Sequence, residues 1–298
     1  MKREADDFFY LRKPYDEILC PSEFWKIVED SEGGKIEDLQ YTPDRLISLE
    51  PPKKWRIKEV TFSNFSFAKT HISYIEFTDC NFENCLFMGS TIVDCRFSNC
   101  IFVSCNFFRS EFISCYIDPN SFIRCNDRKK HANIGLGLYQ ELLHNSRQQA
   151  QPDFTREAQF QFARWKRYFR WSEIKDSEEG GFKKLLQYIS VFPSWAFEKI
   201  AGSGVRLGNI AITSIATLAI LTLINYYWSS SFGLNLGGEP VENIVESFYF
   251  STIVVTSLGF GDITPSTEVG RIIVALEAIV GFVTFATLIS MIFRRITG

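Results

Sequence analysis

The chain has 298 residues, of which 46% are hydrophobic, and its 32 Lys and Arg residues nearly balance 35 Asp and Glu residues for a net charge of -3. This composition excludes an intrinsically disordered chain, and the small negative charge excludes a protein that binds nucleic acid through bulk positive charge. The mean hydropathy of -0.04 is that of an ordinary soluble protein, but it averages over segments that differ strongly along the chain.

Residues 1–56 are expected to form an N-terminal cap for the repeat segment that follows, since a short solenoid exposes its ends. A helical stretch is predicted around residues 23–29 of this cap. The first ten residues are charged and lack the apolar core of a signal peptide. The eight cysteines are therefore expected to be free thiols in a reducing cytoplasm.

A five-residue repeat runs from Phe62 to Phe122, where every fifth residue is Phe or Ile. A series of smaller residues lies two positions before each of these, and its phase contains all of the cysteines except Cys20. Neither a helix of about 3.6 residues per turn nor a strand of period two gives this spacing, which indicates a repeat architecture. For the cysteines, a small side chain in a cramped inner position is favoured over a metal site or redox switch.

These residues resemble the pentapeptide-repeat family, whose chain winds into a four-sided β-helix with both positions of the repeat pointing inward. The resemblance implies a right-handed quadrilateral β-helix over residues 57–125, in which side chains 20 residues apart stack. The sequence supports this stacking, because such residues form uniform columns: Phe62, Phe82, Phe102 and Phe122 in one, and Cys85, Cys105 and Cys125 in another.

Residues 126–205 are predicted to be an α-helical linker, with helices near residues 134–146, 154–174 and 182–200. Basic and aromatic residues are interleaved in the second helix. The favoured interpretation is a connector that packs its aromatic side chains on the end of the β-helix, and the alternative is a membrane-surface helix. The third helix is interpreted as interfacial, and the cations expected to contact anionic lipid are Lys183, Lys184, Lys199 and Arg206.

Residues 206–298 are predicted to be an α-helical membrane domain. Ile210–Trp228 and Ile272–Phe293 are long and apolar enough to cross a bilayer, and the second contains one carboxylate, Glu277. The segment of residues 207–270 lacks Lys and Arg, whereas cations precede the first span and follow the second. The positive-inside rule therefore predicts a multi-pass protein of the cell (inner) membrane with both termini in the cytoplasm.

A third apolar helix, too short to cross the membrane, is predicted over residues 241–255. The sequence Thr-Ser-Leu-Gly-Phe-Gly-Asp follows directly, at residues 256–262. Non-helical backbone at membrane depth is tolerated only where it is buried in protein or lines a watery cavity. Gly259 and Gly261 permit positive φ angles, which would let successive carbonyl groups point the same way.

This arrangement resembles the pore module of tetrameric potassium channels, which consists of outer helix, pore helix, filter and inner helix. The resemblance covers about Ile210–Arg295, and the family signature T-V-G-Y-G-D is met here at residues 257–262. It implies that four chains form one filter and that Asp262 concentrates cations at its outer mouth. The filter residues that it implies are Thr256, Ser257, Leu258, Gly259, Phe260 and Gly261. Those whose carbonyl groups would bind K⁺ are Ser257, Leu258, Gly259 and Phe260.

Departures from the family pattern bear on selectivity. Ser257 stands where the signature has Thr, which leaves weaker selectivity open, and Phe260 stands where it has Tyr. Some relatives place a carboxylate opposite the filter aspartate, and this chain has Ile253 at that position.

The second span carries the other candidate residues of the pore. Gly281 lies where the family keeps a gating hinge, and a close helix contact is the alternative for this glycine. A stripe of three apolar residues is a candidate for the inner constriction of the pore, and ordinary helix packing is an equally weighted alternative. The three residues are Phe285, Ile289 and Phe293. Glu277 must be paired, protonated or facing water at membrane depth. We expect it to brace the pore helix through a hydroxyl group, and the candidates are Tyr249, Ser251 and Thr252.

The sequence therefore predicts a multidomain, homotetrameric, potassium-selective channel. The cytoplasmic pentapeptide-repeat domain is expected to have a regulatory or assembly role. Alternatives are a non-selective monovalent cation channel and a membrane-anchored pentapeptide-repeat interaction protein. K⁺ ions in the filter are expected, but no organic cofactor and no nucleic-acid partner. Three histidines without metal-ligand spacing argue against an enzyme.

Overall fold

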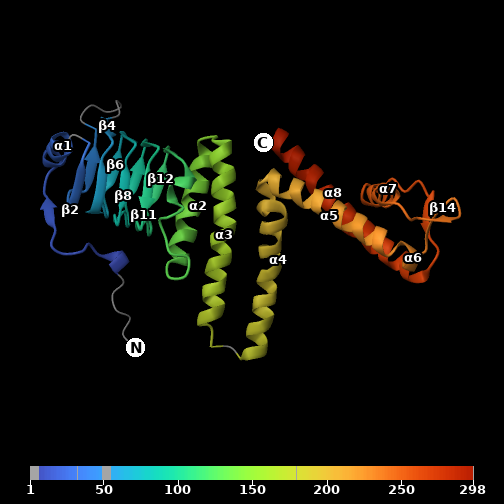
Figure 1. Cartoon of the computed structure of the whole chain (residues 1–298). Coiled ribbons are helices and arrows are strands. Elements are labelled where there is room, and N and C mark those ends of the chain that lie inside the picture. Colours follow the sequence, from blue (N-terminus) through green and yellow to red (C-terminus); the bar gives the residue numbers. More distant parts are fainter. Residues whose placement is uncertain (1–6, 32, 49–54, 179, 298) are drawn as a thin grey trace. The chain divides into compact units, whose positions relative to one another are not determined.

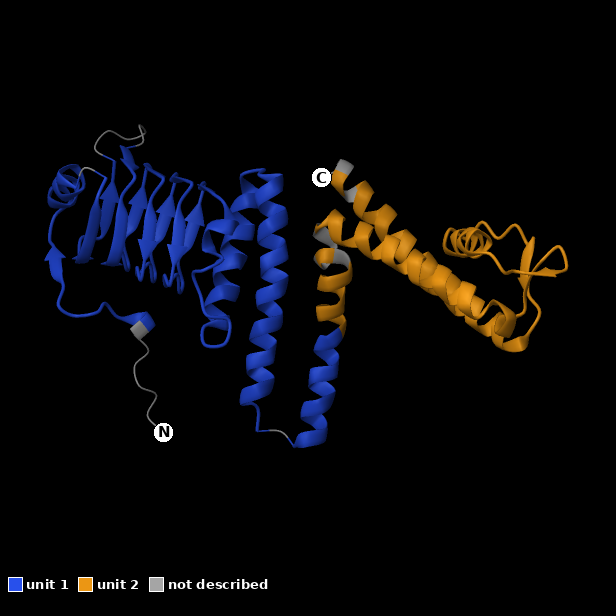
Figure 2. Cartoon of the chain, in the orientation of Figure 1, with its two compact units in different colours: residues 1–192 blue, residues 193–298 orange. Residues whose placement is uncertain are grey.

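The computed structural model describes the chain except for residues 1–6, 32, 49–54, 179 and 298. Parts of the predicted N-terminal cap therefore lie outside the described residues. The chain forms two compact units, residues 1–192 and residues 193–298, which Figure 2 shows in different colours.

The first unit contains a β-solenoid, which confirms the predicted β-helix (Figure 1). Three parallel sheets form three of its faces, and isolated bridges between Ser66, Leu86 and Asn106 form the fourth. The first sheet consists of β1 (Asp16–Ile18), β2 (Lys35–Tyr41), β5 (Thr61–Ser66), β8 (Asn81–Glu83) and β11 (Ile101–Val103). The second consists of β3 (Arg45–Ile47), β6 (His71–Ser73), β9 (Thr91–Val93) and β12 (Glu111–Ile113). The third consists of β4 (Trp55–Lys58), β7 (Ile75–Thr78), β10 (Arg96–Ser98) and β13 (Tyr116–Ile117).

The strand register places identical side chains above one another. Phe62 pairs with Phe82, and Phe82 with Phe102, so residues 20 apart occupy successive coils as predicted. Their rings stack with centroids 5.1 and 4.8 Å apart. Because these rings are fully buried, the column of Phe residues forms the hydrophobic core along the solenoid axis.

The corners of the coils explain the rest of the five-residue period. Residues two positions after the bulky position have positive φ angles, at Asn64, Lys69, Tyr74, Asp79, Asn84, Gly89, Asp94, Asn99, Ser104, Arg109 and Ser114. Asn, Asp and Gly tolerate this left-handed conformation best, and they occupy six of these eleven corners.

The cysteines of the repeat are buried free thiols, and Cys20 is the exposed one. Each donates to the backbone of a neighbouring coil; Cys85 Sγ, for example, lies 3.4 Å from the carbonyl oxygen of Phe62. Burial raises the pKa of the Cys85 and Cys125 thiols, which keeps them protonated. Among the described residues, no group of His, Cys, Asp and Glu is arranged to hold a metal ion. The burial of these thiols in the solenoid core makes them small core side chains.

The coils begin further toward the N-terminus than the repeat spacing indicated. Strands β2, β3 and β4 precede residue 59 and pair in parallel with β5, β6 and β7. Helix α1 (Pro21–Asp30) contains the predicted helical stretch, and its buried Phe24 stacks on Phe62 with ring centroids 6.4 Å apart. The short 3₁₀ helix η1 (Asp7–Phe9) lies ahead of β1. Helix α1 thus covers apolar surface at the first coil.

Helices follow the last coil, after the 3₁₀ helix η2 (Pro119–Phe122). They are α2 (Ala132–Gln148), α3 (Pro152–Asp176) and α4 (Gly181–Val205), and α4 includes residues of both units. The amide of Asn145 in α2 exchanges two hydrogen bonds of 2.9 Å with the backbone of Cys115. Tyr139 and Trp165 join the buried core of the solenoid. Helices α2 and α3 therefore pack their aromatic side chains on the solenoid's end.

The second unit is helical with one small sheet. It contains α5 (Leu207–Tyr227), α6 (Ser229–Phe232), β14 (Leu234–Leu236), β15 (Glu239–Pro240), α7 (Ile244–Val255), β16 (Ile263–Pro265) and α8 (Glu268–Thr297). Helix α5 and residues 268–293 of α8 are long and apolar enough to span a membrane. Helix α7 is shorter, and its buried Phe250 and Ile253 pack with Leu234 and Ile263 in a separate core.

Candidate functional site

The loop of residues 256–262 leaves the C-terminal end of α7 and has an unusual backbone. Three residues in it have positive φ angles, 57° at Ser257, 52° at Gly259 and 79° at Gly261, while Leu258 and Phe260 between them do not. Such alternation between left- and right-handed conformations aligns N–H groups on one side of a chain and carbonyl groups on the other. The loop can therefore present a row of carbonyl oxygens to one ligand.

The start of this loop is fixed by the end of α7. The backbone N–H of Ser257 donates to the carbonyl of Val254 at 3.1 Å, and that of Leu258 donates to the carbonyl of Ile253 at 3.0 Å. These bonds occupy carbonyl groups that a helix end otherwise leaves without partners. The partial negative charge of the helix C-terminus consequently lies beside the loop, where it favours a cation.

Asp262 ends the loop and is held by Tyr249 of α7. The Tyr249 hydroxyl donates to Asp262 Oδ2 at 2.6 Å, and the backbone N–H of Ile263 donates to Oδ1 at 3.1 Å. The bond from Tyr249 lowers the pKa of the Asp262 carboxyl below its ordinary value. Ile253 stands where some relatives carry a carboxylate, so it cannot pair with Asp262 in that way. The Tyr249 hydroxyl is the partner of Asp262 instead, and the sequence did not indicate this contact.

A small antiparallel sheet fixes the chain beyond Asp262. Strand β16 pairs with β14, so that Ile263 lies opposite Leu236 and Pro265 lies opposite Leu234. The Ser266 hydroxyl adds a 3.0 Å hydrogen bond to the carbonyl of Gly233. Both ends of the loop are therefore anchored, one by α7 and the other by this sheet.

Glu277 belongs to a buried polar cluster that joins three helices. One amide group, that of Asn225 in α5, donates to Glu277 Oε2 in α8 and to Ser251 Oγ in α7, each at 3.0 Å. Of the three hydroxyls that were candidate partners of Glu277, only that of Ser251 belongs to this cluster. The Tyr249 hydroxyl is bonded to Asp262, and that of Thr252 donates to the carbonyl of Phe248.

The cluster has further polar capacity. Among the described residues, the buried oxygens without a hydrogen-bond partner include two of this cluster, Glu277 Oε1 and Asn225 Oδ1. Asn225 was missed by the sequence analysis, although an amide within an otherwise apolar span was a visible signal. Its contacts could not be anticipated, because Ser251 and Glu277 lie 26 and 52 residues further along the chain.

Gly281 lies where α8 crosses the end of α7. A Cβ atom at Gly281 would lie 2.6 Å from the Cα atom of Val255, so any larger residue would push the two helices apart. The close contact between the two helices therefore requires glycine at this position. The side chains of Phe285, Ile289 and Phe293 are exposed in the single chain and lie further along α8.

The cations before the first span differ in their surroundings. Lys184 Nζ donates to the carbonyl groups of Lys175 and Ser177, at 2.9 and 3.3 Å, so it stabilises the C-terminal end of α3. Lys183, Lys199 and Arg206 have exposed side chains. Large apolar side chains are exposed along the same helix α4, among them Phe182, Leu186, Ile189 and Trp195.

Comparison with known proteins bears on this part of the chain. Residues 212–298 match a family described as "Ion channel". A "Hyperpolarization-activated voltage-gated potassium channel" of Methanocaldococcus jannaschii is 33% identical over 73 residues, which is 24% of this chain and 34% of that protein. The "Voltage-gated potassium channel Kch" of Escherichia coli is 33% identical over 82 residues, 27% of this chain and 20% of that protein.

The chain thus spans about a third of the length of the first relative and a fifth of the second. The matched residues contain most of α5 and all of α7, the loop of residues 256–262 and α8. The resemblance of this C-terminal part to a two-span potassium-channel pore module is therefore confirmed, and the β-solenoid fits a pentapeptide-repeat domain fused to it.

Proposed function

We propose that four copies of this chain form a potassium channel whose selectivity filter is the loop of residues 256–262. The alternating backbone at Ser257, Gly259 and Gly261 carries the proposal, because it turns successive carbonyl groups to one side. Rings of such carbonyls, contributed by several chains, replace the hydration shell of K⁺ as the ion enters. The similarity to two proteins named as potassium channels supports the same ion.

A single chain supplies only one side of such a ring. The apolar side chains of Leu258 and Phe260 are 60% and 67% exposed in the single chain, on either side of Gly259. Exposed apolar groups of this size favour burial against another subunit. The same applies to Val245 and Phe248 on α7, and these surfaces support a homotetramer around the filter axis.

Each filter residue has a defined role in the proposal. The carbonyl groups of Ser257, Leu258, Gly259 and Phe260 bind K⁺, and the Ser257 hydroxyl completes the innermost site. Thr256 and Gly261 flank these residues and fix the backbone. Asp262 contributes one carboxylate per chain at the outer mouth, where four such charges raise the local cation concentration.

The inner half of the pore has three proposed features. Glu277 braces the pore helix through Asn225, which binds both Glu277 and Ser251. Gly281 permits the close approach of α8 to α7 and serves as the hinge of the inner helix. The inner constriction is formed by Phe285, Ile289 and Phe293.

The proposed orientation follows the positive-inside rule, with both termini and the β-solenoid in the cytoplasm and the spans in the cell membrane. The exposed apolar residues of α4 support contact with anionic lipid through the exposed cations Lys183 and Lys199 of this helix and Arg206, which precedes α5. The solenoid has a regulatory or assembly role in this scheme.

The test is reconstitution of the purified full chain into liposomes and measurement of the reversal potential under a K⁺/Na⁺ gradient. A reversal potential close to the K⁺ equilibrium value is expected. A reversal near zero would indicate a non-selective monovalent cation channel and overturn K⁺ selectivity. No current from a verified tetramer would favour a membrane-anchored interaction protein instead.

Two glycine variants control for leak and misfolding. Gly259→Ala places a side chain on a residue with φ of 52° inside the filter, which strains the backbone that presents the carbonyl groups. Gly237→Ala introduces the same change at φ of 61° in the turn between β14 and β15, again with no neighbouring atom within 4 Å. Loss of K⁺ current is expected for the first variant only.

A further inference from the structure

The polar cluster of Asn225, Ser251 and Glu277 has more acceptor oxygens than hydrogens to satisfy them. The amide of Asn225 has two N–H groups, and both are used, one on Glu277 Oε2 and one on Ser251 Oγ, each at 3.0 Å. The second oxygen of the carboxyl group, Glu277 Oε1, and the amide oxygen, Asn225 Oδ1, are buried without a hydrogen-bond partner among the described residues. An ionised Glu277 would therefore leave two buried acceptors without a donor, which is costly.

An ionised Glu277 would also be a buried charge without a counter-charge. The residue is 5% exposed and lies within residues 268–293, which are apolar enough to span a membrane. In the part of the chain that the structure describes, its side chain forms one hydrogen bond, from Asn225, and no ion pair. Burying an unpaired charge costs far more than burying a neutral polar group, and a carboxyl group at membrane depth is paired, protonated or in contact with water.

The other titratable groups on the three helices do not supply a partner. Tyr249 donates to Asp262, and Arg271 donates to the carbonyl of Pro265. Apart from Glu277, the titratable side chains that the structure describes on α5, α7 and α8 are Tyr226, Tyr227, Glu246, Tyr249, Glu268, Arg271 and Arg295, all of them exposed except the half-buried Glu246. Because Glu277 is covered within the single chain, a neighbouring subunit has little of its surface to reach.

We propose that Glu277 is a protonated carboxylic acid whose O–H group, on Oε1, donates to Asn225 Oδ1 while Asn225 Nδ2 donates to Oε2. The added hydrogen gives both unpartnered oxygens a bond and removes the buried charge. A carboxylic acid and a primary amide each present one donor and one acceptor, so the two planar groups match. The inference rests on the proposed function, in which this cluster braces α7, and it makes Glu277 a positioning residue that depends on a proton.

Infrared spectroscopy of the full chain in dodecyl maltoside, a detergent without carbonyl groups, tests the protonation state at neutral pH. A protonated carboxyl group has a C=O stretching band that an ionised carboxylate lacks, and ordinary exposed carboxyl groups are ionised at this pH. Glu277→Gln should therefore abolish a carboxylic-acid band that the wild type shows. Glu268→Gln is the matched control, because it removes an exposed carboxyl group from the first turn of the same helix and should leave that band unchanged.

Two further measurements test the partner and the position of the proton. Asn225→Ala removes the N–H group that donates to Glu277 Oε2, so the band should move to higher frequency, because the C=O bond strengthens when it no longer accepts a hydrogen bond. Glu277→Gln places an amide N–H group where the acid has its O–H group. The temperature at which the proposed tetramer dissociates should therefore stay within about 2 °C of the wild type in this variant, a shift that corresponds to less than one lost hydrogen bond.

If the wild type shows no carboxylic-acid band that Glu277→Gln removes, Glu277 is ionised and the proposal is overturned. A band that keeps its wild-type frequency in Asn225→Ala would overturn the bond to Asn225. The infrared readout depends neither on ion current nor on assembly of four chains. Its failure would therefore leave the proposed channel function untouched, and a channel that lacked K⁺ selectivity would leave the infrared result valid.

Discussion

At the residue scale, the hydrogen bond from Tyr249 to Asp262 favours negative charge at the outer end of the proposed filter loop. The bond joins the pore helix to the last residue of the loop and lowers the pKa of the carboxyl group. A lowered pKa means that Asp262 stays ionised at a more acidic pH than an ordinary aspartate does. The negative charge at the proposed outer mouth therefore persists on acidification.

Tyr249→Phe removes this bond while keeping the ring. The pKa of Asp262 should then rise toward its ordinary value, so its negative charge is lost at higher pH. Single-channel conductance, measured as the external pH is lowered, should accordingly begin to fall at a higher pH in the variant. Tyr227→Phe is the control, because Tyr227 is exposed at the end of α5. Identical conductance curves for Tyr249→Phe and wild type would contradict this role.

At the scale of elements, Asn225 is the point where α5, α7 and α8 are joined. Its side chain is fully buried, as is that of Ser251, and that of Glu277 is nearly so. A buried polar group that loses its partner costs about 1–3 kcal/mol, because the lost hydrogen bond is not replaced by water. The cluster therefore fixes the position of α7 relative to α5 and α8.

Asn225→Ala should destabilise the assembled pore by about 1–3 kcal/mol, and Glu277→Ala should have a similar effect. The measurement is the temperature at which the proposed tetramer dissociates in detergent. Because both residues act through one hydrogen bond, the double variant should lose less than the sum of the two single losses. Thr284→Val removes a hydroxyl from α8 that bonds only to the carbonyl of Val280, and it should change little. Strictly additive losses would show that the bond does not couple the helices.

The sequence predicted those elements whose residues repeat at short intervals. The columns of Phe82 and Phe102 follow from a period of five, and the spans α5 and α8 follow from continuous apolar composition. The contact of Tyr249 with Asp262, the pairing of β14 with β16 and the role of Asn225 were not predicted. Each joins residues that meet only after the chain has folded, and no local pattern encodes such a meeting.

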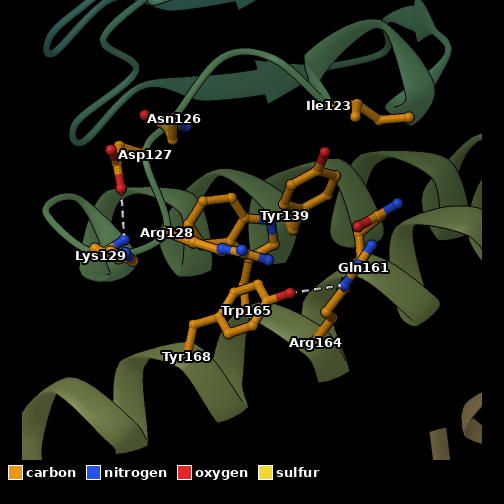
Figure 3. A pocket seen from close by; sticks show the side chains of 10 residues that line it. All are labelled: Ile123, Asn126, Asp127, Arg128, Lys129, Tyr139, Gln161, Arg164, Trp165 and Tyr168. Atoms are coloured by element: carbon orange, nitrogen blue, oxygen red, sulfur yellow. Dashed lines mark hydrogen bonds between the residues drawn. The ribbon is translucent and has the colours of Figure 1, made fainter. Parts of the chain in front are cut away.

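The same reason explains a pocket in the first unit, which Figure 3 shows between the loop after the last coil and helices α2 and α3. Its lining includes Arg128 and Lys129 from the loop and Arg164 from α3. In sequence, Arg164 belongs to a basic and aromatic helix that was interpreted as a connector. Only the packing of α3 on the solenoid end brings this residue to Arg128 and Lys129.

At the scale of the whole molecule, the two units have separate hydrophobic cores. The core of the first unit is formed by residues that lie between Ile18 and Trp165 in the sequence. The two cores of the second unit are formed by residues between Ile210 and Met291. Phe82 lies in the middle of the stacked column, between Phe62 and Phe102. A change at this position should therefore destabilise the first unit alone.

Phe82→Ala removes a fully buried ring and should lower the free energy of unfolding of the solenoid by about 3–5 kcal/mol. Differential scanning calorimetry of the full chain in detergent should show an earlier solenoid transition, with the dissociation of the tetramer unchanged. Ile101→Ala is the control, because Ile101 lies on the exposed face of the strand that contains Phe102. If both transitions of Phe82→Ala moved together, the solenoid and the pore would have to unfold as one cooperative unit, and assembly of the pore would then depend on the solenoid's stability.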